Sequence, residues 1–142
     1  MKKIFKAMTL LVLIALLFAA CAPAIVPGAS DVSLTSKDEV AEYIHQNGCL
    51  PDNFITKSEA RDLGWNGGSL EPYAPGMCIG GDKFGNYEGL LPEKSGRRYY
   101  ECDIDTLGAE TRGAKRIVYS SDGLIYYTED HYNSFELLYG EE

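Results

Sequence analysis

The sequence predicts an α+β domain in which N-terminal helices pack on one face of a C-terminal antiparallel β-sheet. Helix-start signals lie in the first half of the folding region, and a strand-like alternation of apolar and polar residues fills the second half. The pair Asp122-Gly123 separates two of these strand-like runs, which is a strong signal for a β-hairpin. Helices followed by consecutive antiparallel strands are typical of α+β proteins.

The N-terminus has the pattern of an export signal. Three lysines within the first six residues precede an apolar stretch, 10–18, that is short for a bilayer span. Ala19-Ala20-Cys21 then forms a small-residue cleavage site that resembles a bacterial lipoprotein box, in which Cys21 becomes the lipidated first residue. Ordinary signal-peptide cleavage nearby is the alternative. Either route predicts an extracellular protein, and lipidation would tether it to the outer face of the cell membrane.

The sequence divides into a leader, a tether and one domain. Residues 1–20 form the signal peptide, and residues 21–35 have the Pro, Gly and small-residue character of a flexible tether. The folded domain is expected over 36–142, which is long enough for one modest core. We find no internal repeat and no second apolar segment long enough to span a membrane.

The first helix is predicted over 36–47. Ser36 and Glu39 match a capping box, apolar residues follow at helical spacing, and Gly48 supplies a stop. His45 lies on this helix with no metal-ligand partner in register, so we interpret it as a surface histidine.

A second, shorter helix begins at the capping-box pattern of Thr56 and Glu59. This start places Lys57 in the first turn, where the helix dipole disfavours a cation by roughly a few tenths of a kcal/mol. Lys57 is therefore either simply solvated or held at this position by a partner.

From position 78 onward the pattern is that of strands. Residues of high strand propensity recur in runs that are bounded by Gly, Asp and Ser. The expected strands are 78–82, 97–104, 115–121, 124–128 and 135–139.

Lipidation of Cys21 would leave three cysteines for the folded domain. An odd count in an exported protein predicts one bridge and one free thiol. We expect Cys49 to pair with Cys78, because Cys102 lies inside an alternating strand where a small buried thiol packs well.

The composition is acidic, with 21 Asp and Glu against 13 Lys and Arg and a net charge of −8 at pH 7. Removal of the leader lysines makes the mature chain more acidic still. This balance argues against broad nucleic-acid affinity, because binding to a polyanion needs local basic residues that neutralise phosphates. Two distant histidines and the lack of a C-x-x-C pair argue against a zinc site, and we expect no cofactor.

A set of charged residues suggests acid–base chemistry on a phosphodiester. Cleavage of RNA through its own 2′-hydroxyl needs a base, an acid, and cations that hold the charge developing on phosphorus. Glu101 and His131, which follows the predicted hairpin, are available as base and acid. The available cations are Lys57, Arg112 and Arg116. The plainer interpretations are a solvent-facing glutamate and a structural histidine.

Alternation in the run 99–103 places Tyr99, Glu101 and Asp103 on one face of a strand. One division of roles makes Asp103 the buried partner of the arginines at 112 and 116. Glu101 is then free to act as base.

A glycine-rich segment, 80–89, is the other unusual stretch. Its glycines allow the backbone to approach a ligand and to adopt positive φ. Phe84 and Tyr87 offer ring faces for base stacking, and the Glu88 carboxylate can accept the N1–H and N2–H donors of guanine together. A loop turn stabilised by glycines is the structural alternative.

Ten short motifs in the chain occur in an order found in one known family. They are 50–60 (LPDNFITKSEA), 63–65 (LGW), 74–76 (APG), 79–82 (IGGD), 88–89 (EG), 94–97 (KSGR), 103–104 (DI), 116–117 (RI), 119–122 (YSSD) and 130–132 (DHY). Together they resemble the secreted guanyl-preferring bacterial ribonucleases of the barnase and binase type. The resemblance covers essentially all of 36–139.

The resemblance implies the microbial ribonuclease fold, RNA as substrate and a monomeric, metal-independent enzyme. It gives Glu101 the role of general base and His131 that of general acid. The cations Lys57, Arg112 and Arg116 would bind phosphate, which gives the oddly placed lysine its reason. The expected product is a 2′,3′-cyclic phosphate, later hydrolysed with the acid and base roles exchanged.

The resemblance also assigns the remaining site residues. Backbone N–H groups of the guanine-recognition loop would bind the guanine oxygen, and its glutamate would bind the N1 and N2 donors. Tyr132 corresponds to an active-site tyrosine, and Asp82 and Asp103 are supporting carboxylates. The loop residues are Phe84, Asn86, Tyr87 and Glu88.

Two departures from the family pattern bear on function. Tyr87 stands where barnase has an arginine, so a positive charge near the guanine site and the inhibitor surface is missing. The acidic balance contrasts with basic barnase, so we expect affinity for long RNA to be lower and to depend more on a local cationic cleft.

Three functions therefore follow from the sequence. The leading hypothesis is an exported endoribonuclease that prefers guanosine. A lipoprotein that keeps the fold but only binds nucleotides or RNA is the second. The third is an antibacterial ribonuclease toxin whose producer carries a barstar-like inhibitor.

Overall fold

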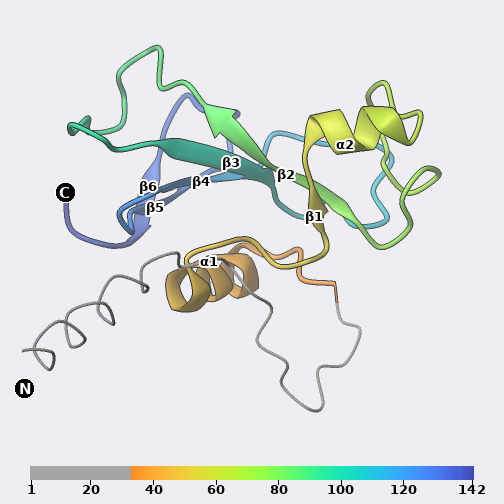
Figure 1. Ribbon diagram of the computed structural model, residues 1–142, viewed down its shortest axis with the longest axis horizontal. Coiled ribbons are helices and arrows are strands. Elements are labelled where there is room, and N and C mark those ends of the chain that lie inside the picture. The colour runs from red at the N-terminus through yellow and green to blue at the C-terminus, as the bar shows by residue number, and fades with distance from the viewer. Residues whose placement is uncertain (1–32) are drawn as a thin grey trace, which may run out of the picture.

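The computed structural model describes residues 33–142. The predicted leader, Cys21 and most of the predicted tether lie outside the described residues. The helices are α1 (Lys37–Asn47) and α2 (Lys57–Asp62), and the strands are β1 (Phe54–Ile55), β2 (Cys78–Phe84), β3 (Tyr99–Asp103), β4 (Arg116–Ser120), β5 (Ile125–Thr128) and β6 (Glu136–Tyr139). The six strands form one sheet in chain order (Figure 1). The predicted α+β fold class is confirmed.

The two helices begin differently although both follow a capping-box sequence. At α2 the box is complete, because Glu59 N donates to Thr56 Oγ1 at 3.3 Å and Thr56 N donates to Glu59 Oε2 at 2.8 Å. At α1 the Ser36 hydroxyl instead donates to the Glu39 carboxylate at 2.6 Å and caps no backbone group. The predicted stop is present, since Gly48 adopts φ 72° and its N–H donates to Ile44 O at 2.7 Å.

The sheet is an antiparallel meander with one parallel pair at its edge. Strands β2 to β6 pair in sequence as antiparallel neighbours, as predicted. The additional strand β1 pairs parallel to β2 through Phe54↔Cys78 and Ile55↔Ile79. A strand of two residues is too short for a periodic pattern, so no local pattern predicts it. The register of β2 shifts between Gly80 and Asp82, which brings Asp82 opposite Glu101.

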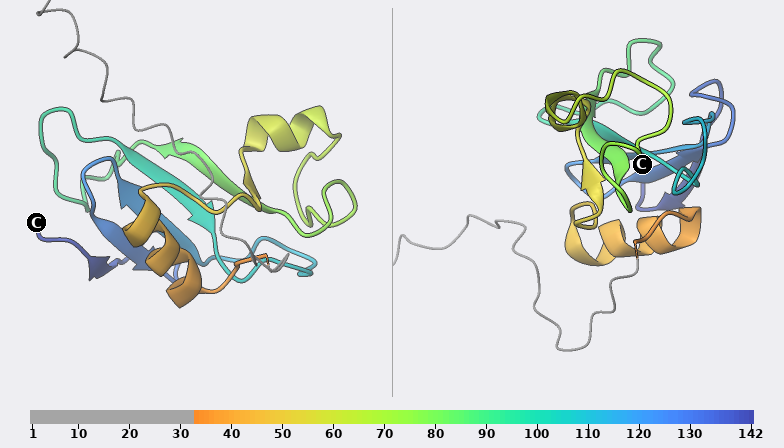
Figure 2. Two further views of the ribbon diagram at one scale, coloured as in Figure 1. Left: turned by 60° about the horizontal axis from the view of Figure 1, so that its bottom comes forward. Right: turned by 90° about the vertical axis from the view of Figure 1, so that its right-hand side faces the viewer.

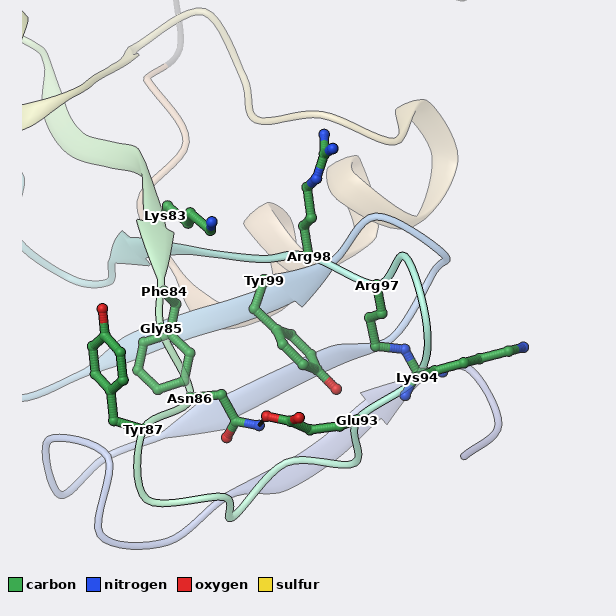
Figure 3. Close-up of a pocket in the computed structure, with 10 residues that line it drawn as sticks. All are labelled: Lys83, Phe84, Gly85, Asn86, Tyr87, Glu93, Lys94, Arg97, Arg98 and Tyr99. Carbon is green, nitrogen blue, oxygen red and sulfur yellow. Dashed lines mark hydrogen bonds between the residues drawn. The ribbon is translucent and has the colours of Figure 1, made fainter.

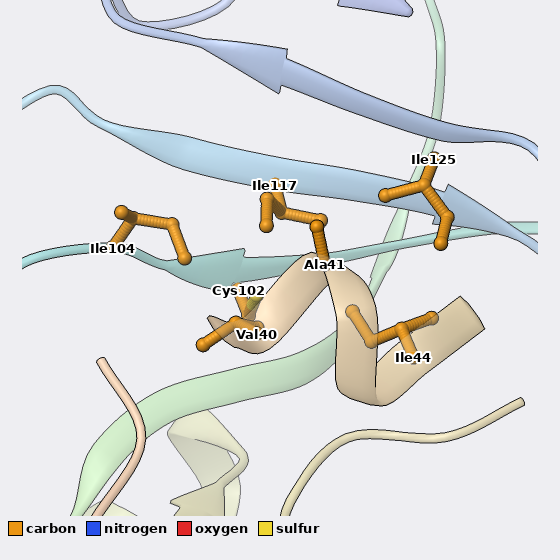
Figure 4. Close-up of a cluster of buried hydrophobic side chains, with 7 residues drawn as sticks. All are labelled: Val40, Ala41, Ile44, Cys102, Ile104, Ile117 and Ile125. Carbon is orange, nitrogen blue, oxygen red and sulfur yellow. The ribbon is translucent and has the colours of Figure 1, made fainter. Parts of the chain in front are cut away.

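Helix α1 covers one face of the sheet. Its residues Val40, Ala41 and Ile44 pack against side chains of β3, β4 and β5 (Figure 4). The sheet contributes Cys102, Ile117 and Ile125 to this cluster, and Ile104 joins them from just after β3. Because neighbouring strand residues point to opposite faces, Val118 and Tyr126 join a second cluster on the other face, with Tyr99 and Leu124.

Helix α2 lies beside β2, away from α1 (Figures 1 and 2). It contributes Ala60 to a third cluster, which also contains Trp65 and Ile79. The side chains of β3 that face away from α1 are therefore bordered by α2 on one side and by the loop after β5 on the other.

The predicted disulfide is wrong. Cys78 and Cys102 are both free and buried. Cys78 lies in β2, with its sulfur 3.9 Å from Thr35 Oγ1 and 4.0 Å from Asn53 Nδ2, whereas Cys49 lies just beyond the end of α1 and is disulfide-bonded. Burial raises the pKa of both free thiols. The placement of Cys102 on a packed strand agrees with the expectation that it stays free.

The contacts of the domain begin just before the predicted start. Leu34 N and Leu34 O both bind the Asn53 side chain, at 3.3 and 2.8 Å, and Asp105 N donates to Thr35 O at 2.8 Å. None of the helices in residues 33–142 has the length and apolar character of a membrane span.

Candidate active site

Glu101 is the centre of the candidate site. It lies in the middle of β3, opposite Asp82 on β2 and Val118 on β4, on the face away from α1. Its carboxylate accepts from Lys57 Nζ at 2.5 Å through Oε1 and from the Tyr132 hydroxyl through Oε2. With only 9% of its surface exposed, it is not the solvent-facing glutamate of the plainer interpretation.

Lys57 reaches Glu101 because Asp82 fixes the start of α2. The Lys57 N–H donates to Asp82 Oδ2 at 2.9 Å, so one carboxylate satisfies a free N–H of the first helical turn. Asp82 and Glu101 are register partners, and the lysine side chain therefore extends over β3. The dipole at α2 disfavours the cation, but the carboxylate of Glu101 offsets that cost.

Asp103 lies two residues after Glu101 in β3, on the same face of the strand, and binds two arginines. Arg112 forms a two-point pair with it, from Nε to Oδ2 at 2.7 Å and from Nη2 to Oδ1 at 2.8 Å. Arg116 Nε lies 3.0 Å from Oδ1, although the angle is too poor for a hydrogen bond. Asp103 is 1% exposed. The hydrogen bonds that Arg112 donates to Asp103 raise the pKa of Arg112 further above its usual range, so the guanidinium stays charged.

The two arginines differ in what they can still offer. Arg116 is 3% exposed and donates three hydrogen bonds to the carbonyls of Arg112, Gly113 and Lys115, at 2.7 to 3.2 Å. Arg112 is more open, and its guanidinium carbon lies 5.8 Å from the centre of the Trp65 ring. We interpret Arg116 as the fixed member of the pair and Arg112 as the one that faces a ligand.

The loop after β5 carries His131 and Tyr132 in left-handed backbone conformations, with φ of 55° and 72°. Such values are costly for these residues and persist where the surrounding contacts impose them. Here Thr128 Oγ1 accepts from Tyr132 N at 3.0 Å and donates to Asp130 Oδ1 at 2.9 Å. Hydrogen bonds from Ser134 to Asp130 lower the pKa of that carboxyl and close the loop.

This loop brings Tyr132 to Glu101 and places His131 beside Tyr132. The Tyr132 ring lies 5.1 Å from the Phe84 ring and 4.8 Å from the imidazole of His131. Burial, followed by the hydrogen bond to Glu101, raises the pKa of Tyr132, so its hydroxyl is a donor. The imidazole is exposed and has no hydrogen-bond partner among residues 33–142. It is therefore free to meet a ligand beside Tyr132.

A cavity of about 310 Å³ joins Glu101 to the glycine-rich loop. Its walls include Phe84 and Glu88 on one side and Glu101, Tyr132 and Phe135 on the other. An exposed carboxylate and a group of aromatic rings thus share one space with the Glu101 carboxylate. Sequence reasoning missed Phe135, which we took only as the start of the last strand. Its ring contacts Phe84 at 6.3 Å, a contact that no local pattern predicts.

Asn86 does not offer its side chain to this cavity. The side chain is buried, donates to Leu91 O at 2.9 Å and to Glu93 Oε1 at 3.1 Å, and accepts from Leu91 N at 3.1 Å. With φ 49°, Asn86 turns the loop and leaves its backbone groups for a ligand. Tyr87 next to it is 98% exposed, so its ring is open to solvent.

In the described part of the chain, no group of three or more His, Cys, Asp or Glu side chains is arranged to hold a metal ion. The residues that converge are instead one carboxylate, one lysine, one tyrosine, one imidazole and an aspartate-bound pair of arginines. This set can take up a proton, supply a proton and bind a phosphate.

Comparison with known proteins identifies the family. A family model described as ribonuclease matches residues 37–139, which span both helices and all six strands. This chain belongs to that ribonuclease family. The resemblance found in the sequence is confirmed, and the convergence around Glu101 lies wholly within the matched residues of the ribonuclease domain.

Relatives with a ribonuclease name support the same assignment. The chain is 53% identical over 100 residues to a ribonuclease of Heyndrickxia coagulans, an overlap that covers 69% of this chain and 91% of that protein. A ribonuclease of Bacillus intermedius has the same identity over 100 residues, 69% of this chain and 61% of that protein. The chain thus spans about three fifths of the length of that second ribonuclease.

More distant similarities involve ribonucleases named for guanyl specificity. Guanyl-specific ribonuclease St of Saccharopolyspora erythraea is 44% identical over 57 residues, 40% of this chain and 56% of that protein. A solved structure, ribonuclease Sa2 with guanosine-2′-cyclophosphate, has 37% identity and a TM-score of 0.33 over 38% of this chain and 56% of that chain. The fold described above does not depend on this partial overlap.

Proposed function

We propose that this ribonuclease is an endonuclease that cleaves RNA on the 3′ side of guanosine. The observation that carries the proposal is the Glu101 carboxylate, held by Lys57 and Tyr132 in the wall of the same cavity that contains Phe84 and Glu88. A base-binding loop and a proton acceptor in one space allow a single bound nucleotide to meet both.

In the first step Glu101 removes the proton of the guanosine 2′-hydroxyl. The 2′-oxygen then forms a bond to the adjacent phosphorus, the bond from phosphorus to the 5′-oxygen breaks, and His131 protonates the departing oxygen. The product is a 2′,3′-cyclic phosphate. In the second step His131 takes a proton from water, the water oxygen forms a bond to phosphorus, the bond from phosphorus to the 2′-oxygen breaks, and Glu101 gives its proton to the departing 2′-oxygen.

Cations next to Glu101 would stabilise the charge that develops on phosphorus. Lys57 lies against the carboxylate itself, and Arg112 is held toward the same face of β3 by Asp103. Both are positioned before substrate binds, and such preorganised charges lower the barrier because they need no rearrangement during the reaction. The buried Arg116 side chain supports Arg112 by donating a hydrogen bond to the Arg112 carbonyl oxygen.

Preference for guanine is supported by the loop that precedes Glu101. Glu88 is exposed at the cavity, where its carboxylate can accept the two donors of a guanine edge. The loop backbone around Asn86 can serve the guanine oxygen. Several relatives carry guanyl specificity in their names, which is consistent with this assignment.

The function is tested with a soluble form that lacks residues 1–21. Cleavage of a guanylyl dinucleotide in the presence of a chelator, with a cyclic phosphate as first product, is expected. The matching DNA dinucleotide should survive because it lacks the 2′-hydroxyl. Binding of guanosine nucleotides without turnover would instead favour the binding-only alternative. Cleavage that is unaffected by His131→Ala would contradict the mechanism.

We further propose that the protein is exported and anchored through a lipid on Cys21. Support comes from the leader pattern alone, and mass spectrometry of the native mature N-terminus tests it. A diacylglycerol thioether on the first residue is the expected result. Cys49 is disulfide-bonded. A Cys21 sulfur that carries a lipid thioether cannot also form a disulfide, so finding a Cys21–Cys49 bridge would overturn the anchor.

A barstar-like inhibitor is proposed as the protein partner. An active ribonuclease endangers its producer if export fails, and the exposed cavity mouth is accessible to another protein. Expression of the leaderless form should be toxic and should be relieved by a matching inhibitor. Harmless expression of a fully active enzyme would argue against both the inhibitor and the antibacterial role.

A further inference from the structure

Most basic side chains of this acidic domain are paired, but a few are not. Residues 33–142 contain ten lysines and arginines, and six of them form ion pairs with carboxylates. The side chains of the other four have no hydrogen-bond or ion-pair partner within the described residues. They are Arg61, Lys83, Lys94 and Arg98.

Three of these four unpaired cations line one cavity. This space of about 360 Å³, here called the basic cavity, lies between the end of β2 and the segment that leads into β3 (Figure 3). Lys83 lines it from β2, and Lys94 and Arg98 line it from the segment before β3. Unpaired cations that line one space favour an anion there, so an anionic ligand would be stabilised at this cavity.

The strand register explains why Lys83 and Arg98 lie near each other. Lys83 is opposite Tyr100, and Arg98 precedes Tyr100 by two positions, so the two cations are diagonal neighbours on the same face. The only carboxylate in the wall of the basic cavity, Glu93, accepts from Asn86 Nδ2 and so is turned toward the loop. The fourth cation of the wall, Arg97, is occupied by Asp122.

The basic cavity adjoins the candidate active site. The five consecutive residues 83–87 line both spaces, so they form the partition between them. Strand β1 pairs with β2 only as far as Ile79, so residues 83–84 have no strand neighbour on that edge of β2. An extended chain bound at Glu101 and Glu88 can therefore pass over this edge into the basic cavity.

We propose that the basic cavity binds the phosphate on the 5′ side of the guanosine, through Lys83, Lys94 and Arg98. The inference rests on the proposed function. The guanosine 3′-phosphate must lie at Glu101, and the strand that continues in the 3′ direction leaves from that end. The basic cavity lies beyond the guanine loop, away from Glu101, and so receives the preceding phosphate. It gives an acidic enzyme a local grip on longer RNA.

The test measures binding without cleavage. Two 2′-deoxy dinucleotides, d(GpA) and d(pGpA), differ only in a 5′-phosphate and lack the nucleophile. The full domain is expected to bind d(pGpA) on the order of tenfold more tightly at low salt, as a partly solvated phosphate among cations would. The triple variant Lys83→Gln, Lys94→Gln, Arg98→Gln should bind the two ligands equally.

A charge-matched control separates this site from overall charge. The triple variant Lys37→Gln, Arg61→Gln, Lys115→Gln removes three surface cations outside the basic cavity, and it should keep the preference for d(pGpA). Equal loss in both triple variants, or no preference in the unmodified domain, would overturn the inference. Cleavage of GpA is measured separately, so failure of the enzyme and failure of this phosphate site give different results.

Discussion

Glu101 and Asp103 are two carboxylates on the same face of β3, and their surroundings are opposite. Asp103 is 1% exposed and bound by two guanidiniums, one of which is itself buried. Glu101 is 9% exposed, has one lysine and one tyrosine as partners, and lines a cavity. The two carboxylates are thus only two positions apart on one strand, yet Asp103 is closed off and a ligand can reach Glu101.

The surroundings of a carboxylate therefore decide whether it stabilises the structure or takes part in a reaction. A buried carboxylate with several charged partners cannot lose one of them without leaving an unpaired charge. A carboxylate at a cavity, held by partners that remain partly accessible, can exchange a proton with a ligand. Four substitutions test this comparison.

The largest effect is expected from Asp103→Asn. It leaves two guanidiniums without their carboxylate, so the free energy of unfolding should fall by about 3–5 kcal/mol. Urea unfolding measures this loss. Asp105→Asn is the control, because its pair with Lys115 is exposed and should contribute no more than about 1 kcal/mol. Equal effects of the two variants would remove the distinction drawn for Asp103.

Glu101→Gln should have the reverse profile. The amide cannot act as a base, so kcat on a guanylyl dinucleotide should fall by about 10²–10⁴-fold. The free energy of unfolding should fall by less than it does in Asp103→Asn, because Lys57 is partly exposed. Glu110→Gln, at an exposed carboxylate, controls for charge. A variant that keeps full activity would exclude Glu101 as the base.

Tyr132→Phe removes one hydrogen bond to Glu101 and keeps the ring against Phe84. Because a hydrogen bond to a charged group contributes about 1.5–3 kcal/mol, kcat/KM should fall by roughly 10- to 100-fold. The matched control is Tyr126→Phe, whose hydroxyl donates to Glu142. Similar losses in the two variants would mean that the hydroxyl at 132 has no special link to Glu101.

The smallest effect concerns Asp122, an aspartate that pairs with an arginine near the surface. The hydrogen bonds from Arg97 lower the pKa of Asp122 in the folded protein. Its contribution to stability is therefore present above the unfolded pKa, about 3.9, and is lost as the pH falls through the folded value. At neutral pH, Asp122→Asn should cost no more than about 1 kcal/mol, because the carboxylate is 36% exposed.

The measurement is the difference in unfolding free energy between the unmodified protein and Asp122→Asn from neutral to acidic pH. The difference should shrink toward zero at the acidic end. A difference that grows as the pH falls would contradict the sign. A loss as large as that of Asp103→Asn would show that pairing with arginine, rather than burial, governs the comparison.

Much of the fold follows from local patterns. The Thr56 and Glu59 capping box marks the start of α2, and alternation gives the strands from β2 to β6 to within a few residues. The grouping of Glu101 and Asp103 on one face also follows from the two-residue period of a strand. The strand β1 escapes such reasoning, because two residues carry no period and their pairing depends on β2.

The order of the elements, the family and the residue types available for acid–base chemistry can all be predicted from the sequence. These depend on neighbours within a few positions or on motifs that are read directly. Only the tertiary structure decided that Lys57 meets Glu101, that Asn86 turns its side chain inward, and that Cys78 stays free. Each of these outcomes depends on contacts made across the packed domain, where strand register and burial select one partner among several that are chemically equivalent.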